Sequence, residues 1–320
     1  MDINAVDLSS VMNKLNKILK EVNKTVIGKN HITAKVLMAI IAGGHILIDD
    51  IPGVGKTTMV LSFSKALDLH CNRMQFTPDV LPTDIVGFSV YNPTNGKFEY
   101  KKGVAVCNLF LADEINRTSS KTQSALLEIM EEKRITAEGK SYDLPSPYIV
   151  IATQNPVGSV GTQMLPDSQL DRFMIKLSMG YPSAKAEIDI LKNKSNEALK
   201  KVTKVTDADD IILLQKIVSN IYVDDRIYDY MVRLADATRK HPMIKLGLSP
   251  RGSISLCSMS KAAALMHGRG YVIPDDVSEV FSDVAAHRII LEGKAKLSSM
   301  NAEKIAAEIL RNVPLPKVQN

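Results

Sequence analysis

Strand-like apolar stretches and helix-like segments alternate along the first half of this 320-residue chain. Such an alternation favours a mostly parallel sheet with helices on both faces. It therefore restricts the first part of the chain to the α/β class. The expected strands are HILID (45–49), CNRMQFT (71–77), NLFLAD (108–113), YIVIAT (148–153) and MIKLSM (174–179).

The pattern changes after GYPSAKAE (180–187), because no further buried strand is evident. We expect an α/β core over residues 1–181, opening with an amphipathic helix within 8–24, and an all-helical lid domain over 182–320. The boundary is expected near Tyr181 and Pro182. The helices of the lid are expected near 185–200, 207–220, 224–239, 250–267 and 275–290.

Composition excludes several classes of protein. The three cysteines form no C-x-x-C pair, which argues against a disulfide framework or a zinc site and favours a reducing cytoplasm. The longest apolar run, VLMAIIA (36–42), is too short to span a bilayer, and the first residues resemble no signal peptide. Tryptophan is absent, so a base-stacking surface for nucleic acid has little material despite the net charge of +5.

A phosphate-loop pattern follows the first expected strand. In DDIPGVGKTT (49–58), the pattern G-x-x-x-x-G-K-[ST] is complete except for Asp50, which replaces the first glycine. Gly53 and Gly55 let backbone N–H groups surround phosphates, Lys56 reaches the β- and γ-phosphates, and Thr57 is a ligand for Mg²⁺. Asp50 is compatible with this role if its side chain turns away from the phosphates. A purely structural glycine-rich turn is the alternative.

Two adjacent carboxylates end the apolar strand NLFLADE (108–114). Charge at the end of a buried strand is costly unless a cation lies nearby. We interpret Asp113 as the carboxylate on the Mg²⁺ side and Glu114 as the group that polarises an attacking water. Together with the phosphate loop, this pair predicts nucleotide hydrolysis.

Two hairpins are expected within the first domain. Asn95-Gly96 is a strong turn signal inside FSVYNPTNGKFEYKKG (88–103), and RITAEGKSYDLP (134–145) turns near Glu138-Gly139. Each could simply close an edge of the central sheet.

These motifs together resemble the MoxR family of AAA+ ATPases, in which the phosphate loop often reads D-x-P-G-x-G-K-T. The resemblance covers most of the chain and implies an AAA+ core with a helical lid. The matching stretches are FTPDVLPTDIVG (76–87), LFLADEINRTSSKTQSALLEIMEE (109–132), IATQNPVGSVGTQMLPDSQLDRF (151–173), GYPSAKAE (180–187) and LSPRGSISL (248–256).

The resemblance implies roles for individual residues. Asn155 matches sensor 1, Arg172 in QLDRF matches the arginine finger that reaches a neighbouring subunit, and Arg251 in SPRGS matches sensor 2 over the nucleotide. Ile27 and Gly28 match the segment around adenine. The ATP-binding loop implied by the family comprises Pro52, Gly53, Val54, Gly55, Lys56, Thr57 and Thr58, with Asp113 nearby.

The predicted function is ATP hydrolysis with Mg²⁺ in a homo-oligomeric, hexameric ring that remodels or matures a client protein. The resemblance implies a separate partner with a von Willebrand factor A domain, and it implies that the hairpin aromatics Phe88, Tyr91 and Phe98 face the client near the ring pore. A nucleotide-dependent binding switch with slow hydrolysis is the main alternative. A DNA-dependent ring motor is disfavoured by the lack of a basic-aromatic track, and a kinase by a site suited to water.

Overall fold

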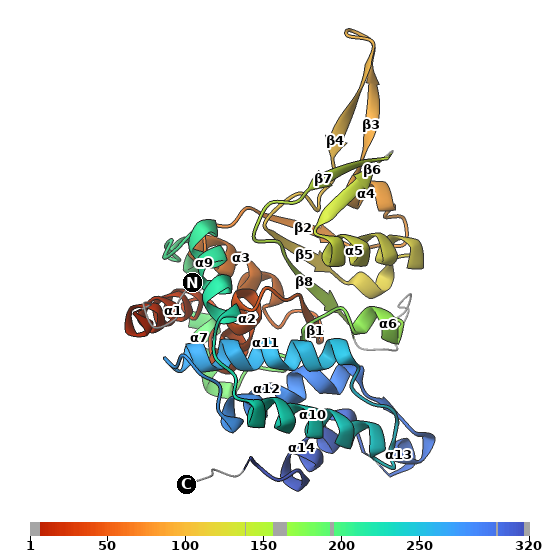
Figure 1. The fold of residues 1–320 in the computed structure, drawn as a ribbon. Coiled ribbons are helices and arrows are strands. Elements are labelled where there is room, and N and C mark those ends of the chain that lie inside the picture. Colours follow the sequence, from red (N-terminus) through yellow and green to blue (C-terminus); the bar gives the residue numbers. More distant parts are fainter. Residues whose placement is uncertain (1–6, 138, 156–164, 193–194, 299, 317–320) are drawn as a thin grey trace.

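A central sheet of five parallel strands organises the computed structural model, which describes residues 7–137, 139–155, 165–192, 195–298 and 300–316 (Figure 1). All five strands form where the sequence predicts them, so the α/β class is confirmed. In spatial order the strands are β2 (Cys71–Gln75), β5 (Leu109–Asp113), β8 (Ile149–Gln154), β1 (Ile46–Asp49) and β9 (Ile175–Leu177).

The middle strands are apolar because helices cover the sheet on both faces. Every residue of β5 is buried, and β5 pairs with β8 so that Leu111 lies opposite Ile151. Parallel pairing puts the carboxyl ends of β1, β5 and β8 at one edge of the sheet. The polar residues that follow these strands therefore meet at that edge.

The helices of the core begin with α1, whose N-terminus is capped by the Asp7 carboxylate through the backbone N–H groups of Ser9 and Ser10. Its apolar stripe buries Leu15 and Ile18, which confirms the predicted amphipathic helix. The core contains α1 (Leu8–Val22), α2 (Asn30–Ile41), α3 (Lys56–Ala66), α4 (Pro82–Val86), the 3-10 turn η2 (Ile115–Arg117), α5 (Ser120–Glu132) and α6 (Asp167–Leu170).

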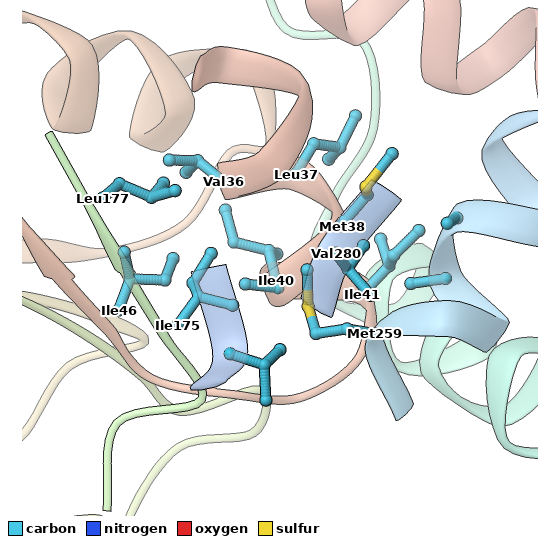
Figure 2. Close-up of a cluster of buried hydrophobic side chains, with 14 of the residues drawn as sticks. Val36, Leu37, Met38, Ile40, Ile41, Ile46, Ile175, Leu177, Met259 and Val280 are labelled. Atoms are coloured by element: carbon cyan, nitrogen blue, oxygen red, sulfur yellow. The ribbon is translucent and has the colours of Figure 1, made fainter. Parts of the chain in front are cut away.

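Helix α2 lies between the sheet and the lid. It buries eight of its twelve residues, which explains the long apolar run in this part of the sequence. Figure 2 shows Ile40 beside Ile46 and Ile175 of the sheet, whereas Ile41 faces Met259 and Val280 of the lid. The two parts of the chain consequently share one continuous hydrophobic cluster.

The lid is helical, as predicted, and additionally contains a two-stranded antiparallel sheet of β10 (Ile244–Leu246) and β11 (Ile290–Leu291). These strands have three and two residues, too few for an alternating pattern to be visible in the sequence. Across the described ranges, no helix has the length and apolarity needed to cross a membrane. The lid helices are α7 (Ala184–Lys192), α8 (Ser195–Lys200), α9 (Ala208–Ser219), α10 (Asp225–Lys240), α11 (Pro250–Met266), α12 (Pro274–Ala285), η3 (Ala286–Arg288), α13 (Gly293–Leu297) and α14 (Ala302–Asn312).

Both predicted hairpins form: β3 (Gly87–Asn92) pairs with β4 (Lys97–Lys102), and β6 (Arg134–Ala137) pairs with β7 (Lys140–Asp143). Each is a separate two-stranded sheet, so the interpretation that they close an edge of the central sheet is wrong. Tyr100 of β4 stacks on Tyr142 of β7 with ring centroids 4.1 Å apart. The first hairpin projects away from the body of the molecule (Figure 1). Glu138, expected in the second turn, lies outside the described residues.

Candidate active site

The phosphate loop connects β1 to α3 in the strand–loop–helix context that its pattern requires. Gly53 and Gly55 adopt φ angles of 86° and 94°, in the left-handed region that favours glycine. A Cβ atom at either position would meet no other atom within 4 Å, so the backbone conformation, and not crowding, requires glycine. Thr57 and Thr58 lie in the first turn of α3, where unpaired backbone N–H groups favour an anion.

Lys56 is buried at the start of α3, and its Nζ donates a hydrogen bond to the backbone carbonyl of Asp50 at 2.7 Å. Burial lowers the pKa of this ammonium, and the carboxylates of Asp113, Asp50 and Glu114 act in the opposite direction. The lysine therefore lies among the carboxylates at the carboxyl ends of β1 and β5.

Asp50 is the unusual residue of the loop. Its side chain is buried and accepts hydrogen bonds from other residues of the protein. Its Oδ1 accepts from the Ile51 backbone N–H at 2.8 Å. Its Oδ2 accepts from the Gly180 backbone N–H at 2.6 Å and from the Ser178 hydroxyl at 3.3 Å. The carboxylate is thus bound to the segment that leads to the lid.

Asp113, the last residue of β5, has a partner for each carboxylate oxygen. The Thr153 hydroxyl of β8 donates to Oδ1 at 2.6 Å, and the Arg73 guanidinium of β2 donates to Oδ2 at 2.8 Å. Arg73 supplies the cation that a buried carboxylate at a strand end requires. Sequence analysis missed Arg73, because it lies in β2 beside the polar residues Asn72 and Gln75 and does not stand out there.

Glu114 follows in the left-handed conformation with φ 58°, which turns its side chain out of the strand direction. Its carboxylate accepts hydrogen bonds from Asn155 Nδ2 at 3.0 Å and from Arg117 Nη1 at 2.7 Å. Burial raises the pKa of Glu114, but the hydrogen bonds from Arg117 and Asn155 outweigh burial, and the pKa lies below its ordinary value. The carboxylate is ionised at neutral pH.

Asn155 is buried at the end of β8 and is fixed by Asn116, whose side chain bonds both the backbone N–H and the carbonyl of Asn155. The Nδ2 atom donates to Glu114, and the Oδ1 atom is buried without a hydrogen-bond partner among the described residues. The structure thus brings together Glu114 and Asn155, two residues that the sequence singled out separately.

A cavity of about 210 Å³ lies beside the phosphate loop. Ile27 lines it, as expected for the adenine segment, whereas Gly28 contacts the lid: a Cβ at Gly28 would lie 2.7 Å from the Ala186 Cβ. The cavity is lined by residues of the N-terminal segment, the loop and the lid, namely Thr25, Val26, Ile27, Lys29, Gly53, Val54, Gly55, Thr58, Met179, Pro182 and Ile190.

The two predicted arginines lie together, away from this cavity. Arg172 and Arg251 both form ion pairs with Glu131 at the end of α5, and the Arg172 Nη2 atom is 3.2 Å from its carboxylate. Arg251 is not among the residues that line the cavity beside the loop, although sensor 2 was expected over the nucleotide. Glu131 had no local sequence signal, because it is 41 positions before Arg172 and 120 before Arg251.

A buried ion pair holds both arginine-bearing segments in place. Arg288 donates from Nε to the Asp171 carboxylate at 2.8 Å and also bonds the backbone carbonyls of Asp171 and Phe173. The Ser249 hydroxyl donates to Asp171 at 3.0 Å while it caps α11 by accepting from the Gly252 N–H. Asp171 and Ser249 directly precede the segments that carry Arg172 and Arg251.

Comparisons with known proteins agree with this geometry. Residues 45–175 match the ATPase family associated with various cellular activities (AAA), and residues 236–309 match the AAA lid domain. Chaperone MoxR1 of Mycobacterium tuberculosis is 36% identical over 98% of this chain and 85% of its own length. The uncharacterised protein YeaC of Bacillus subtilis is 46% identical over 94% and 95% of the two chains.

A solved structure of a provisionally assigned ATPase from Cytophaga hutchinsonii superposes with a TM-score of 0.90 at 37% identity and covers 97% of both chains. A phosphate-loop sheet with Asp113 and Glu114 at its edge, followed by a helical lid, defines a AAA+ ATPase. The chain belongs to the MoxR family of these ATPases.

Proposed function

We propose that this protein hydrolyses ATP to ADP and phosphate, and that it acts as a ring which remodels or matures a client protein. The observation that carries the proposal is the pair of Glu114 and Asn155, in which the side-chain amide of Asn155 donates at 3.0 Å to the ionised carboxylate of Glu114. One group accepts a proton and the other orients a water, and the phosphate loop is close by. This arrangement suits water as the acceptor of the phosphoryl group.

The phosphate loop binds the polyphosphate through its backbone N–H groups and the N-terminus of α3. Lys56 exchanges its bond to the Asp50 carbonyl for the β- and γ-phosphates. Glu114 takes the proton of the attacking water as Asn155 holds that water in line.

The residues present also fit Mg²⁺. Thr57 and Asp113 would hold the ion, because hydroxyl and carboxylate oxygens are the ligands that Mg²⁺ prefers, and Asp113 already accommodates a cation in the form of Arg73. When bound, Mg²⁺ neutralises charge on the phosphate oxygens.

The ring proposal rests on Arg172 and Arg251. Both side chains are partly exposed, and both are neutralised by Glu131 instead of by a group of the same subunit's phosphate loop. Their common position favours a role for the two arginines at the nucleotide of a neighbouring subunit, in a hexamer like those of the wider class.

Client contact is proposed for the first hairpin. Phe88, Tyr91 and Phe98 are 47%, 54% and 71% exposed, and apart from the edge-on contact of Tyr91 with Phe98 they have no aromatic partner among the described residues. Apolar side chains on a projecting hairpin suit a peptide client. A separate protein with a von Willebrand factor A domain is proposed as a partner.

The experiment that tests hydrolysis replaces Glu114 by Gln. Glu114→Gln should bind ATP with near-normal affinity, because the amide preserves size and hydrogen bonding, but turnover should fall about a hundredfold or more. Binding of a fluorescent ATP analogue and phosphate release are measured on one preparation, with Lys56→Ala as the control that loses binding. Normal turnover in Glu114→Gln would remove Glu114 from this role.

Two further readouts separate the competing functions. In a binding switch, turnover stays slow when a client is added, whereas a remodelling ATPase is stimulated. A DNA-dependent motor would show stimulation by DNA that declines with salt.

A further inference from the structure

Asp50 is the one departure from the phosphate-loop pattern, and its carboxylate lies between the loop and the lid. One oxygen accepts from the loop itself, at Ile51, and the other accepts from Ser178 and Gly180. A glycine at this position would leave the Gly180 N–H without the acceptor at 2.6 Å. The carboxylate therefore joins the phosphate loop to Ser178 and Gly180, which lie 128 and 130 positions after Asp50 in the sequence.

The segment that Asp50 holds is the connection between β9 and α7. Lys29 binds the same connection, because its Nζ donates to the backbone carbonyls of Met179 and Tyr181. Four successive residues, 178–181, are thus bound alternately by an anion from the phosphate loop and a cation from the segment before α2.

Helix α7, which follows this connection, is held by few other contacts. It buries only Ala186, which packs on Gly28, while Ile188 and Leu191 are 51% and 78% exposed. Pro182 and Ile190 line the cavity beside the phosphate loop. The position of α7 therefore depends on the connection and determines the shape of one wall of the nucleotide cavity.

The backbone of Asp50 also contacts the phosphate-binding lysine of the loop. Its carbonyl oxygen accepts from Lys56, the side chain that the proposed function assigns to the phosphates. When Lys56 turns to a phosphate, this carbonyl loses its donor, which changes the contacts of the residue whose side chain holds 178–180. A single residue is thus in contact with the phosphate-binding lysine and with the connection to the lid.

We propose that Asp50 is a positioning residue that couples occupancy of the phosphate loop to the connection 178–181 and to α7. The inference rests on the proposed ATP binding, but not on hydrolysis or on a client. It explains why a carboxylate replaces the glycine of the usual pattern.

The test uses Asp50→Asn in the full chain, since the amide keeps the size of the side chain but presents an N–H₂ group to at least one of its donors. Asp49→Asn is the matched control: the adjacent carboxylate pairs with Lys176 of β9 at 3.2 Å and, among the described residues, forms no hydrogen bond to the connection. Amide hydrogen exchange of residues 178–192 is measured with and without a non-hydrolysable ATP analogue, together with affinity and turnover.

In the wild type and in Asp49→Asn, the analogue should change exchange across 178–192. In Asp50→Asn, exchange in this segment should be fast and should not respond to the analogue. Affinity should stay within about fivefold, and kcat should fall by about ten- to a hundredfold, because misplacement distant from the reacting atoms has effects of this size. Ser178→Ala, which removes one of the two bonds from the connection, should give a smaller loss of response and replaces Asp50→Asn if that variant does not fold.

A wild-type response in Asp50→Asn or an unchanged response in Ser178→Ala would overturn the coupling role. If the wild type binds and hydrolyses ATP but exchange in 178–192 never responds, the coupling inference fails and the proposed function stands. If the wild type binds no nucleotide, both fail.

Discussion

His45 shows how a single buried residue fixes its own charge state. The Val150 backbone N–H donates to Nδ1 at 3.0 Å, so Nε2 must carry the proton that it shares with the Met130 carbonyl at 2.9 Å. Burial lowers the pKa of His45 to about 4, and Lys133 adds to this effect against the bond to Met130. The ring connects the end of α5 to β8 only while it is neutral.

The depressed pKa predicts acid sensitivity of the fold. Between pH 6.5 and about 4 the unfolded chain binds a proton at His45 that the folded chain does not. The stability that neutral His45 contributes is therefore fully present above pH 6.5. As the pH falls through this window, the free energy of unfolding decreases by about 1.4 kcal/mol per pH unit. Urea denaturation at pH 7, 6 and 5 measures the free energy of unfolding of the wild type and of His45→Gln. The same dependence on pH in both proteins would contradict the prediction. His287, whose pKa is also lowered, adds a loss of the same sign in both proteins.

Sequence predicts a site residue best when its partners are close along the chain or follow a neighbouring strand. Asp113 and Glu114 were predicted because two carboxylates end an apolar strand, and Asn155 because it matches sensor 1 of the family. Arg117 is three positions after Glu114, so its ion pair was accessible to the same reasoning. Glu131 was not, because its pairs with Arg172 and Arg251 depend on how α5 packs against the lid.

At the scale of elements, strands and long helices were predicted well, whereas short ones were not. Five apolar runs became the five strands of the sheet, and the turn at Asn95-Gly96 placed a hairpin correctly. The pair β10–β11 was missed, since contacts from distant segments decide such short strands. Helix α14 was also missed, although Ile305 and Ile309 form a helical apolar stripe that the sequence shows. The hairpins were predicted as hairpins, but their independence from the central sheet depends on tertiary packing.

The junction of α6, α11 and η3 depends on Arg288, whose side chain is 2% exposed. Burial lowers the pKa of Arg288, and the Asp171 carboxylate opposes that shift. Arg288→Met should reduce the free energy of unfolding by about 3–5 kcal/mol, because it leaves the Asp171 charge without its buried partner. Chemical denaturation gives the value.

The double variant Arg288→Met with Asp171→Asn is the control. It removes the unpaired charge and should recover part of the loss. Additive effects of the two substitutions would show that the ion pair is not what holds this junction together.

At the scale of the whole molecule, the position of Arg172 predicts that a complete active site needs two subunits. Arg172→Ala should bind ATP without hydrolysing it, since an arginine finger contributes about 10³–10⁵ in rate in related phosphoryl transfer. Arg172→Ala and Glu114→Gln, each inactive alone, should regain partial activity when mixed, because some interfaces then combine an intact Glu114 with an intact Arg172.

Turnover is measured across mixing ratios, and native mass spectrometry reports mixed oligomers. Mixed oligomers without activity would place Arg172 in its own subunit. Mixing Arg251→Ala with Glu114→Gln in the same way distinguishes a role of Arg251 at the nucleotide of the neighbouring subunit from a role at the nucleotide of its own subunit.

The central position of α2 has a consequence for the modularity of the chain. The matched family regions, residues 45–175 and 236–309, both leave α2 outside, yet α2 carries the apolar contacts that join them. A chain cut after residue 181 would expose the side of α2 that Met259 and Val280 cover. We expect such a fragment to aggregate instead of binding ATP, and the intact chain to unfold in one calorimetric transition. Neither half is then a unit that evolution or an experimenter could exchange alone.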